Sequence, residues 1–134
     1  MSDQTVILGM GFKSDAPLFA LENAARAACD TTGLVPDVIA TLTSKVGHPP
    51  FIALAEKLNA RIIALAPDDI RGVPTPTASQ RIQALFGTGS VAEAVAIAAI
   101  PGATLQESRK VSTDNTTTAT ATAALALAPR KTDK

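Results

Sequence analysis

The chain has 134 residues, of which 46% are hydrophobic and 3% aromatic, and every aromatic is a phenylalanine. Lysine and arginine together number 12, as do aspartate and glutamate, so the formal net charge is zero and a bulk positive field that would attract nucleic acid is excluded. A single cysteine and a single histidine exclude an intrachain disulfide and a structural zinc cluster.

The length and composition predict one cytoplasmic α/β domain over residues 1–128 and a flexible charged tail over residues 129–134. No apolar stretch approaches the ~20 residues that a membrane-spanning helix needs. We expect no metal, no cofactor, no nucleic acid and no membrane partner. Alanine occurs 26 times, which indicates a core of closely approaching backbones.

The first half of the chain alternates strand and helix patterns. Residues 5–8 form a short apolar run, which predicts a buried strand that leaves through a loop carrying Gly9 and Gly11. A helix is predicted from about Asp15 to Gly33, where the glycine ends it. Further strands are predicted at residues 38–42 and 61–65, with a helix at 51–58 between them. This β-α-β-α-β order implies a parallel sheet.

The second half predicts a helical turn at residues 67–70, a loop at 72–76 and a helix at 79–86. A second helix follows to about Ile100, capped by Ser90 and Glu93 in a capping-box pattern. Residues 103–110 and 116–127 are expected to form a hairpin across 112–115. Segment 116–128 is compatible with helix through its alanines and with strand through its threonines, and its two-residue alternation favours strand. The predicted fold is a three-layer α/β/α domain with a mixed sheet.

Ligands of open parallel sheets bind outside the carboxyl ends of the strands. We call the loops that follow the first three predicted strands the carboxyl edge. The first two of these loops contain cations, hydroxyls and glycines, and two helices begin beside them with free amides, so this edge suits an anion. Its residues are Gly9, Gly11, Lys13, Ser14, Thr43, Ser44, Lys45, His48, Asp68 and Asp69.

Other candidates carry weaker signals. The Gly9-x-Gly11 pattern after a strand matches only part of the dinucleotide-binding fingerprint. Ser14 stands where the fingerprint has glycine or alanine, and no acid that could hold a ribose hydroxyl follows the second strand. His48 is the only imidazole and a weak candidate for a general base. The segment of residues 87–90, with Thr88 and Ser90, forms a glycine-rich turn at a helix start and predicts an anion nest. Cys29 lies on the apolar stripe of the first helix and is expected to be a core residue.

The order of these segments resembles the CobE family, which matches the C-terminal domain of CbiG, over residues 6–127. The resemblance rests on Gly9-x-Gly11, on residues 39–42 followed by Lys45, on residues 54–59, on Arg109 and Lys110, and above all on residues 87–94. The family usually shows Cys-Arg-Arg-Gly after Gly11, whereas this chain reads Phe-Lys-Ser-Asp, so one of two cations is kept, as Lys13.

The resemblance implies a role in building the corrin ring of cobalamin. Together with the carboxyl edge, it leads us to expect an accessory protein that binds a polycarboxylated tetrapyrrole (precorrin-type) intermediate, with other cobalamin-pathway enzymes as further partners. The expected binding residues are Gly9, Gly11, Lys13, Lys45, His48, Thr88, Ser90 and Lys110. Two alternatives stay open: an enzyme that opens a lactone or modifies the ring of the same intermediate, with His48 as its base, and an unrelated small-anion or nucleotide-binding domain.

Overall fold

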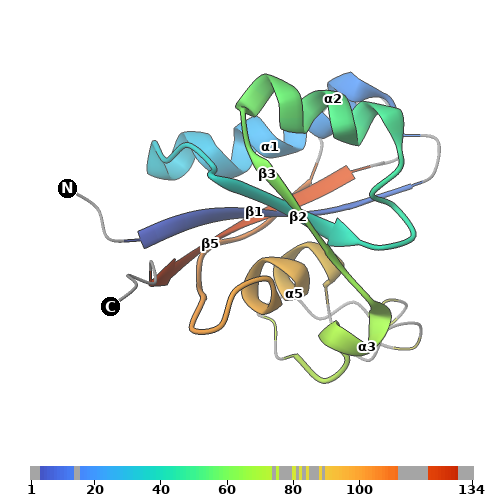
Figure 1. Ribbon diagram of the computed structural model, residues 1–134, viewed down its shortest axis with the longest axis vertical. Helices are drawn as coiled ribbons and strands as arrows, with labels where there is room; N and C mark the ends of the chain where they lie inside the picture. Colours follow the sequence, from blue (N-terminus) through green and yellow to red (C-terminus); the bar gives the residue numbers. More distant parts are fainter. Residues whose placement is uncertain are drawn as a thin grey trace.

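The computed structural model describes residues 4–13, 16–73, 75, 80, 82, 84, 88, 90–111 and 121–129, with only the backbone described at residues 31 and 107–111. Figure 1 shows the arrangement of the elements. In chain order these are β1 (Gln4–Phe12), α1 (Leu18–Thr32), β2 (Val38–Leu42), α2 (Pro49–Leu58), β3 (Arg61–Leu65), α3 (Pro67–Ile70), α5 (Val91–Ala98), β4 (Thr104–Val111) and β5 (Ala121–Pro129).

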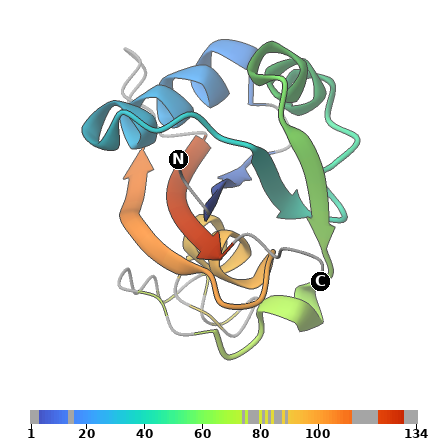
Figure 2. The ribbon, with the colours of Figure 1, turned by 60° about the vertical axis from the view of Figure 1, so that its left-hand side comes forward.

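The strands form one mixed sheet in the order β3-β2-β1-β5-β4. Strands β1, β2 and β3 are parallel, and β5 runs antiparallel to both β1 and β4. Helices α1 and α2 cover one face of the sheet, whereas α5 and the short α3 cover the other (Figures 1 and 2). The predicted three-layer α/β/α fold with a parallel first half and a C-terminal hairpin is therefore confirmed.

The central strand β1 is buried on both faces, and its alternate side chains enter two separate apolar clusters. One cluster lies under α1 and α2 and the other lies against α5. Ile7 belongs to the α5 cluster, and the residues of β1 in the cluster under α1 and α2 are Val6, Leu8, Met10 and Phe12. This alternation is unbroken as far as Phe12, so the same pleat holds along the strand.

The prediction that β1 ends at residue 8 and leaves through a glycine loop was wrong, because the strand continues through both glycines to Phe12. A Cβ atom on Gly9 would lie 2.2 Å from the carbonyl oxygen of Ala92 and 2.7 Å from the amide nitrogen of Ala96, both in α5. Glycine is needed here because another backbone approaches closely. Glycines that read as a loop in the sequence therefore mark a helix–strand contact.

The alanine-rich strand β5 follows the predicted two-residue period. Ala121, Ala123 and Leu125 pack in the cluster under α1 and α2, whereas Ala126 and Ala128 pack against α5. The strand is in register with all of β1, from Phe12 opposite Ala121 to Gln4 opposite Pro129. Small side chains on both faces of β5 let the helices of both layers approach the middle of the sheet.

Helix α1 begins at Leu18 with Pro17 in the N-cap position, later than the start near Asp15 that the sequence predicts. Asp15 itself lies outside the described residues. The predicted C-terminal glycine is confirmed: Gly33 has a φ of 73°, and its amide donates to the carbonyl oxygen of Cys29 at 2.7 Å. Only glycine adopts this left-handed conformation at little cost.

Helix α2 begins at Pro49, two residues earlier than predicted, because prolines fit the first helical turn. Helix α5 begins with Ser90 as its N-cap, as predicted, and its last helical residue is Ala98, short of the predicted Ile100. Of the helix predicted at 79–86, residues 80, 82 and 84 are helical and the others lie outside the described residues. The turn at 112–115 and residues 130–134 also lie outside them.

Candidate functional site

The carboxyl ends of β1 and β2 lie side by side, as the parallel pairing requires, so the loops that follow them are neighbours. Lys13 follows β1 directly and is exposed. Residues 43–47 form tight turns after β2, in which the Lys45 amide donates to the carbonyl oxygen of Leu42 at 2.9 Å and the His48 amide donates to that of Lys45 at 3.1 Å. These turns place Lys45 and His48 on one short loop.

The ring of Phe12 holds this loop in place. It stacks on the His48 ring at a centroid distance of 5.2 Å and on the Phe51 ring at 5.6 Å. The ammonium nitrogen of Lys45 lies 5.8 Å from the Phe12 centroid, within the range of a cation–π contact. We call Phe12, Lys45, His48 and Phe51 the Phe12 cluster. It joins the end of β1, the loop after β2 and the first turn of α2.

His48 also connects the two loops through a hydrogen bond. Its Nε2 lies 2.8 Å from the carbonyl oxygen of Ala16, in the segment that leads from β1 into α1. Because a carbonyl oxygen only accepts, Nε2 carries the proton, and in the neutral ring Nδ1 is the remaining acceptor. His48 therefore fixes the spacing of the loops that carry Lys13 and Lys45.

The start of α2 differs from the expected amide-rich helix end. Pro49 and Pro50 have no N–H group, and the amides of Phe51 and Ile52 both donate to the His48 carbonyl oxygen, at 2.9 and 3.1 Å. This helix start therefore presents no amides to an anion, and the sequence-based expectation of free amides there was wrong. In this part of the carboxyl edge, only the cationic side chains and the helix dipole favour binding of an anion.

Gly11 lies within β1 and faces the start of α5. A Cβ atom on Gly11 would lie 3.2 Å from the Thr122 hydroxyl oxygen and 3.4 Å from Cβ of Val91. The Thr122 hydroxyl donates to the Gly11 carbonyl oxygen at 3.3 Å. Gly9 is covered by α5, as described above. Ligand contacts by Gly9 and Gly11 stay predictions, and the structure gives both glycines a part in helix packing.

Thr88 and Ser90 are both buried, and their hydroxyl groups have partners inside the protein. The Thr88 hydroxyl donates to the carbonyl oxygen of Val73 at 2.6 Å. The Ser90 hydroxyl accepts from the Glu93 amide at 3.3 Å, which caps α5. Gly87 and Gly89, the glycines of the predicted anion nest, lie outside the described residues. Binding by Thr88 and Ser90 stays a prediction.

The backbone register locates Lys110, whose position relative to the other cations the sequence leaves open. Lys110 in β4 is opposite Ala123 in β5, and Ala123 is opposite Met10 in β1. The backbone of Lys110 is therefore level with the last residues of β1, at the same end of the sheet as Lys13. Arg109 precedes it on the same strand, so the backbone of both residues lies toward the end of the sheet that carries the carboxyl edge.

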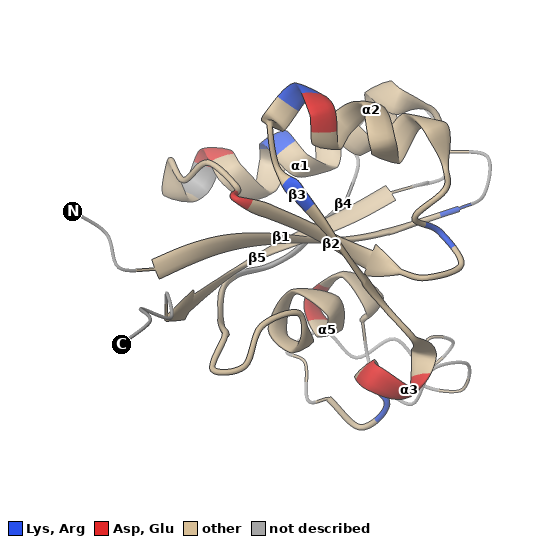
Figure 3. Ribbon diagram, viewed as in Figure 1, with Lys and Arg blue, Asp and Glu red and all other residues tan. Residues whose placement is uncertain are grey.

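The described charges are distributed unevenly over the molecule. Figure 3 shows basic residues at the ends of β1 and β2, and acidic residues mainly on the helices. One described ion pair, Lys57 with Glu22 at 2.5 Å, lies away from the carboxyl edge, and another, Arg71 with Asp68 at 3.1 Å, lies in the loop after β3. Among the described residues, basic side chains are therefore concentrated where β1 and β2 end.

Cys29 behaves as the expected core residue. It packs at the margin of the cluster under α1 and α2. Burial, with a smaller contribution from the Asp30 carboxylate, raises the pKa of the Cys29 thiol from 9.0 to about 11. A thiol with so high a pKa carries almost no thiolate at neutral pH and is a poor nucleophile.

The described part of the chain contains neither a metal-binding cluster nor a membrane-spanning helix. No group of three or more His, Cys, Asp or Glu side chains there has the arrangement of a metal site. None of its helices is long and apolar enough to cross a membrane.

The Phe12 cluster was not predicted from the sequence. The available signal was the alternation of Val6, Leu8, Met10 and Phe12, which continues the strand to the ring. A strand that ends at Phe12 places this side chain beside the loop after β2, where an aromatic ring packs against His48.

The fold and the site define a three-layer α/β/α domain whose mixed sheet carries lysines at the carboxyl ends of its parallel strands. Comparison with protein families shows what kind of domain this is. The family model described as "Cobalamin synthesis G C-terminus" matches residues 6–126. The chain therefore belongs to this family of cobalamin biosynthesis proteins, as the resemblance in its sequence indicates.

Solved structures agree with this assignment. The chain is similar to CobE, a protein from the cobalamin (vitamin B12) biosynthetic pathway, with a TM-score of 0.77 and 23% identity over 94% of this chain and 95% of that one. It is also similar to the cobalamin biosynthesis protein chiG from Agrobacterium tumefaciens, with a TM-score of 0.68 and 26% identity over 92% of this chain and 98% of that one. A search of curated proteins gave no match.

Proposed function

We propose that this protein binds a polycarboxylated tetrapyrrole intermediate of cobalamin biosynthesis at the carboxyl edge, as an accessory protein of the pathway. The observation that carries the proposal is the Phe12 cluster, which holds Lys45 beside the segment that contains Lys13. Precorrin-type intermediates carry several carboxylate side chains around one ring. A pair of lysines on adjacent loops matches such a ligand, because each lysine can meet a different carboxylate.

The affinity in this proposal comes from several weak contacts. One solvent-exposed ion pair contributes only about 0.2–1 kcal/mol and is screened by salt. Two lysines on adjacent loops therefore give a salt-sensitive interaction. Fixed loops reduce the entropy that the protein loses on binding, and the stack of Phe12 on His48 supplies that rigidity.

The packing around Phe12 also supports a polar mode of binding. Phe12 and Phe51 are buried, so their rings are committed to the protein interior. Contacts with the macrocycle would then come from carboxylate recognition and from aliphatic and backbone groups of the loops. This agrees with the scarcity of aromatic residues in the sequence, where only four phenylalanines occur.

The test is a titration of the purified protein with precorrin-type intermediates, followed by the absorbance of the tetrapyrrole. The protein contains no tryptophan or tyrosine, so its own absorbance leaves the ligand signal clear. The double variant Lys13→Glu, Lys45→Glu replaces two attractions by two repulsions. We expect a loss of affinity of roughly 30- to 100-fold, which corresponds to about 2–3 kcal/mol. The loss should shrink as salt is added.

A matched control is the double variant Lys57→Glu, Arg61→Glu, which makes the same change in net charge at the opposite end of the sheet, where α2 ends and β3 begins. Both residues are exposed. Its affinity should stay within a few-fold of the wild type, because charges beyond the ~10 Å screening length act weakly. Equal losses in the two double variants would mean that net charge alone governs binding. An unchanged affinity in Lys13→Glu, Lys45→Glu would refute the proposed site.

A further inference from the structure

The two edges of the sheet differ in how they are protected. One edge is β4, whose sequence Gln-Glu-Ser-Arg-Lys is polar and charged, and its pairing with β5 has register shifts after Leu105 and after Glu107. Charges and irregular register are devices that prevent a strand edge from pairing with another chain. The other edge is β3, with the sequence Arg-Ile-Ile-Ala-Leu and an uninterrupted register with β2. Only its first residue is charged.

The outer side of β3 presents backbone hydrogen-bonding groups. The Arg61 amide donates to the Asp37 carbonyl oxygen at 3.0 Å, and the Leu65 carbonyl oxygen accepts from Thr43 at 2.8 Å. These odd-numbered residues therefore point their backbone groups toward β2. Because successive residues of a strand point to opposite sides, the amides and carbonyls of Ile62 and Ala64 face away from β2. Figure 2 shows β3 at the outer border of the sheet.

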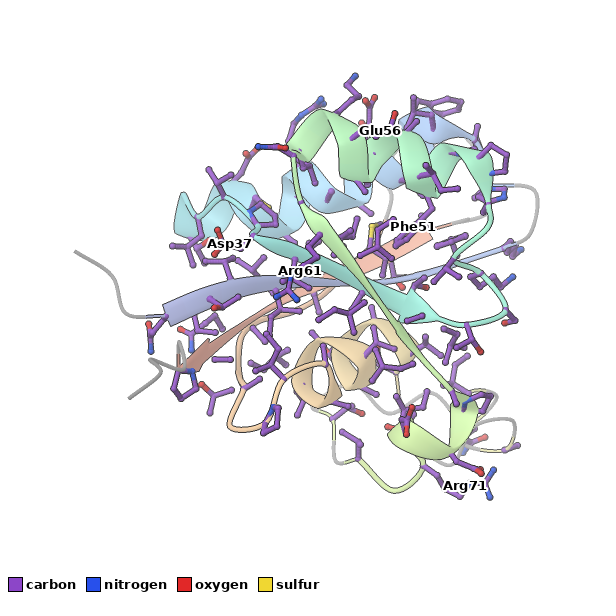
Figure 4. The ribbon with its side chains drawn as sticks, in the orientation of Figure 1. Asp37, Phe51, Glu56, Arg61 and Arg71 are labelled. Atoms are coloured by element: carbon purple, nitrogen blue, oxygen red, sulfur yellow. The ribbon has the colours of Figure 1, made fainter. Side chains whose placement is uncertain are left out.

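An apolar groove lies directly beside this strand, between β3 and α2. It has a volume of about 510 Å³. Ile62 and Ile52 are 38% and 37% exposed there, although both are large aliphatic side chains. The only charged residues that line it are Glu56 and Arg61, which come from α2 and β3 (Figure 4). The remaining lining residues are Ala55, Asn59 and Ala60.

We propose that β3 and this groove form a homodimer interface, in which β3 of a second copy pairs antiparallel with β3 about a two-fold axis at Ile63. In this register Ile62 of each copy is opposite Ala64 of the other, and each such pair exchanges both backbone hydrogen bonds. The outward groups of the strand are therefore complementary to themselves. The result is one continuous sheet across both copies, with the Ile62 and Ile52 side chains covered on the α2 side.

The charges of the chain favour a second copy as the occupant. In the antiparallel arrangement the two Arg61 side chains lie at opposite ends of the paired strands, roughly 13 Å apart at 3.3 Å per residue. Glu56 lies near the Arg61 end of β3, so the two glutamates are separated in the same way, and only apolar residues meet at the axis. The formal net charge of zero removes long-range repulsion between copies. A strongly charged partner would find no complementary field in this groove.

The test is the mass of the full chain by sedimentation equilibrium over about 10 μM to 1 mM, a range in which weak dimers are detected. We expect a mass that approaches twice the 13.7 kDa of the chain. Hydrogen exchange at the two ends of this range adds a register-specific readout. The amides of Ile62 and Ala64 should become protected as the concentration rises, whereas the Ile63 amide, which faces β2, should be equally protected throughout.

Variants distinguish pairing through β3 from non-specific self-association. Ile62→Lys places a charge on the exposed strand and should weaken self-association at least tenfold. Val35→Lys is the matched control, since Val35 is 69% exposed and lies outside β3. It should leave the dimer unchanged. Ala64→Pro removes one outward N–H without adding charge, and it provides the second test if Ile62→Lys lowers the folded fraction in circular dichroism.

Each other outcome overturns the proposal. A wild-type mass of one chain across the whole range would show that this edge does not pair with itself. A dimer that persists in both Ile62→Lys and Ala64→Pro would place the interface elsewhere. Concentration-dependent protection at amides outside β3, with none at Ile62 and Ala64, would also show that the interface lies elsewhere.

Discussion

Replacement of Gly9 by alanine tests the helix–strand contact at the centre of the fold. The added Cβ atom would lie 2.2 Å from the Ala92 carbonyl oxygen, and contacts below 3.0 Å are essentially not seen for real Cβ atoms. The opposing atoms belong to the backbone of α5, so a side-chain rotation does not relieve the clash. Helix α5 must move away from β1 by roughly 1 Å, which loosens the buried contacts of the whole helix.

We expect Gly9→Ala to lower the free energy of unfolding by about 3 kcal/mol, at the upper end of the usual cost of overpacking. At about 4 °C per kcal/mol for a chain of this size, the melting temperature should fall by roughly 10 °C. Thermal and urea unfolding followed by far-ultraviolet circular dichroism measure both quantities, and they suit a protein without tryptophan.

Two other glycines complete the series. A Cβ atom on Gly11 would meet the Thr122 hydroxyl at 3.2 Å, a contact that a small shift relieves, so Gly11→Ala should cost less than Gly9→Ala. A Cβ atom on Gly47 would meet nothing within 4 Å, so Gly47→Ala should be neutral or stabilise by up to about 0.5 kcal/mol through the unfolded chain. Equal stability of Gly9→Ala and Gly47→Ala would refute the packing argument.

The remaining predictions concern the lone histidine and the lone cysteine. His48→Ala removes the hydrogen bond to Ala16 and the stack on Phe12, so it should lower the free energy of unfolding, measured in urea, by about 1–2 kcal/mol. An unchanged free energy of unfolding would show that His48 does not stabilise the Phe12 cluster. Because the pKa of Cys29 is about 11 in the folded protein against 9.0 ordinarily, iodoacetamide should modify it about 100-fold more slowly at neutral pH than it modifies a free thiol. The same raised pKa means that the folded protein loses stability as the pH rises from 9 toward 11, and Cys29→Ala should remove that part of the pH dependence. If the free energy of unfolding of the variant falls equally between pH 9 and 11, the raised pKa of Cys29 is contradicted.

The fold was largely predictable because its signals are local. The alternation of alanine with threonine or leucine in residues 116–128 has a period of two, and a period is independent of what packs against the strand. The β-α-β-α-β order follows from apolar runs separated by proline and glycine. In the same way Ser90 and Glu93 predict a helix start from their spacing alone, and the cap is present.

What was missed depends on contacts between distant segments. Gly9 reads as a loop residue until α5, more than 80 positions away, is seen to rest on it. The two prolines at the start of α2 read as a helix signal, but their missing N–H groups matter only once that helix end is considered as an anion site. The approach of His48 to Ala16 depends on how two loops pack, which no spacing in the sequence encodes.

The position of β5 has a consequence for how the protein forms. This last strand of the sheet lies between β1 and β4 and is in register with all of β1, the first strand. During synthesis, β1, β2 and β3 leave the ribosome first, with the inner side of β1 still unpaired. The sheet is complete only when β5 has been made, so its central contacts join opposite ends of the chain and closure is expected to be slow. Until then β1 is a temporary edge, and nascent chains need protection at the strand that occupies the centre of the finished sheet.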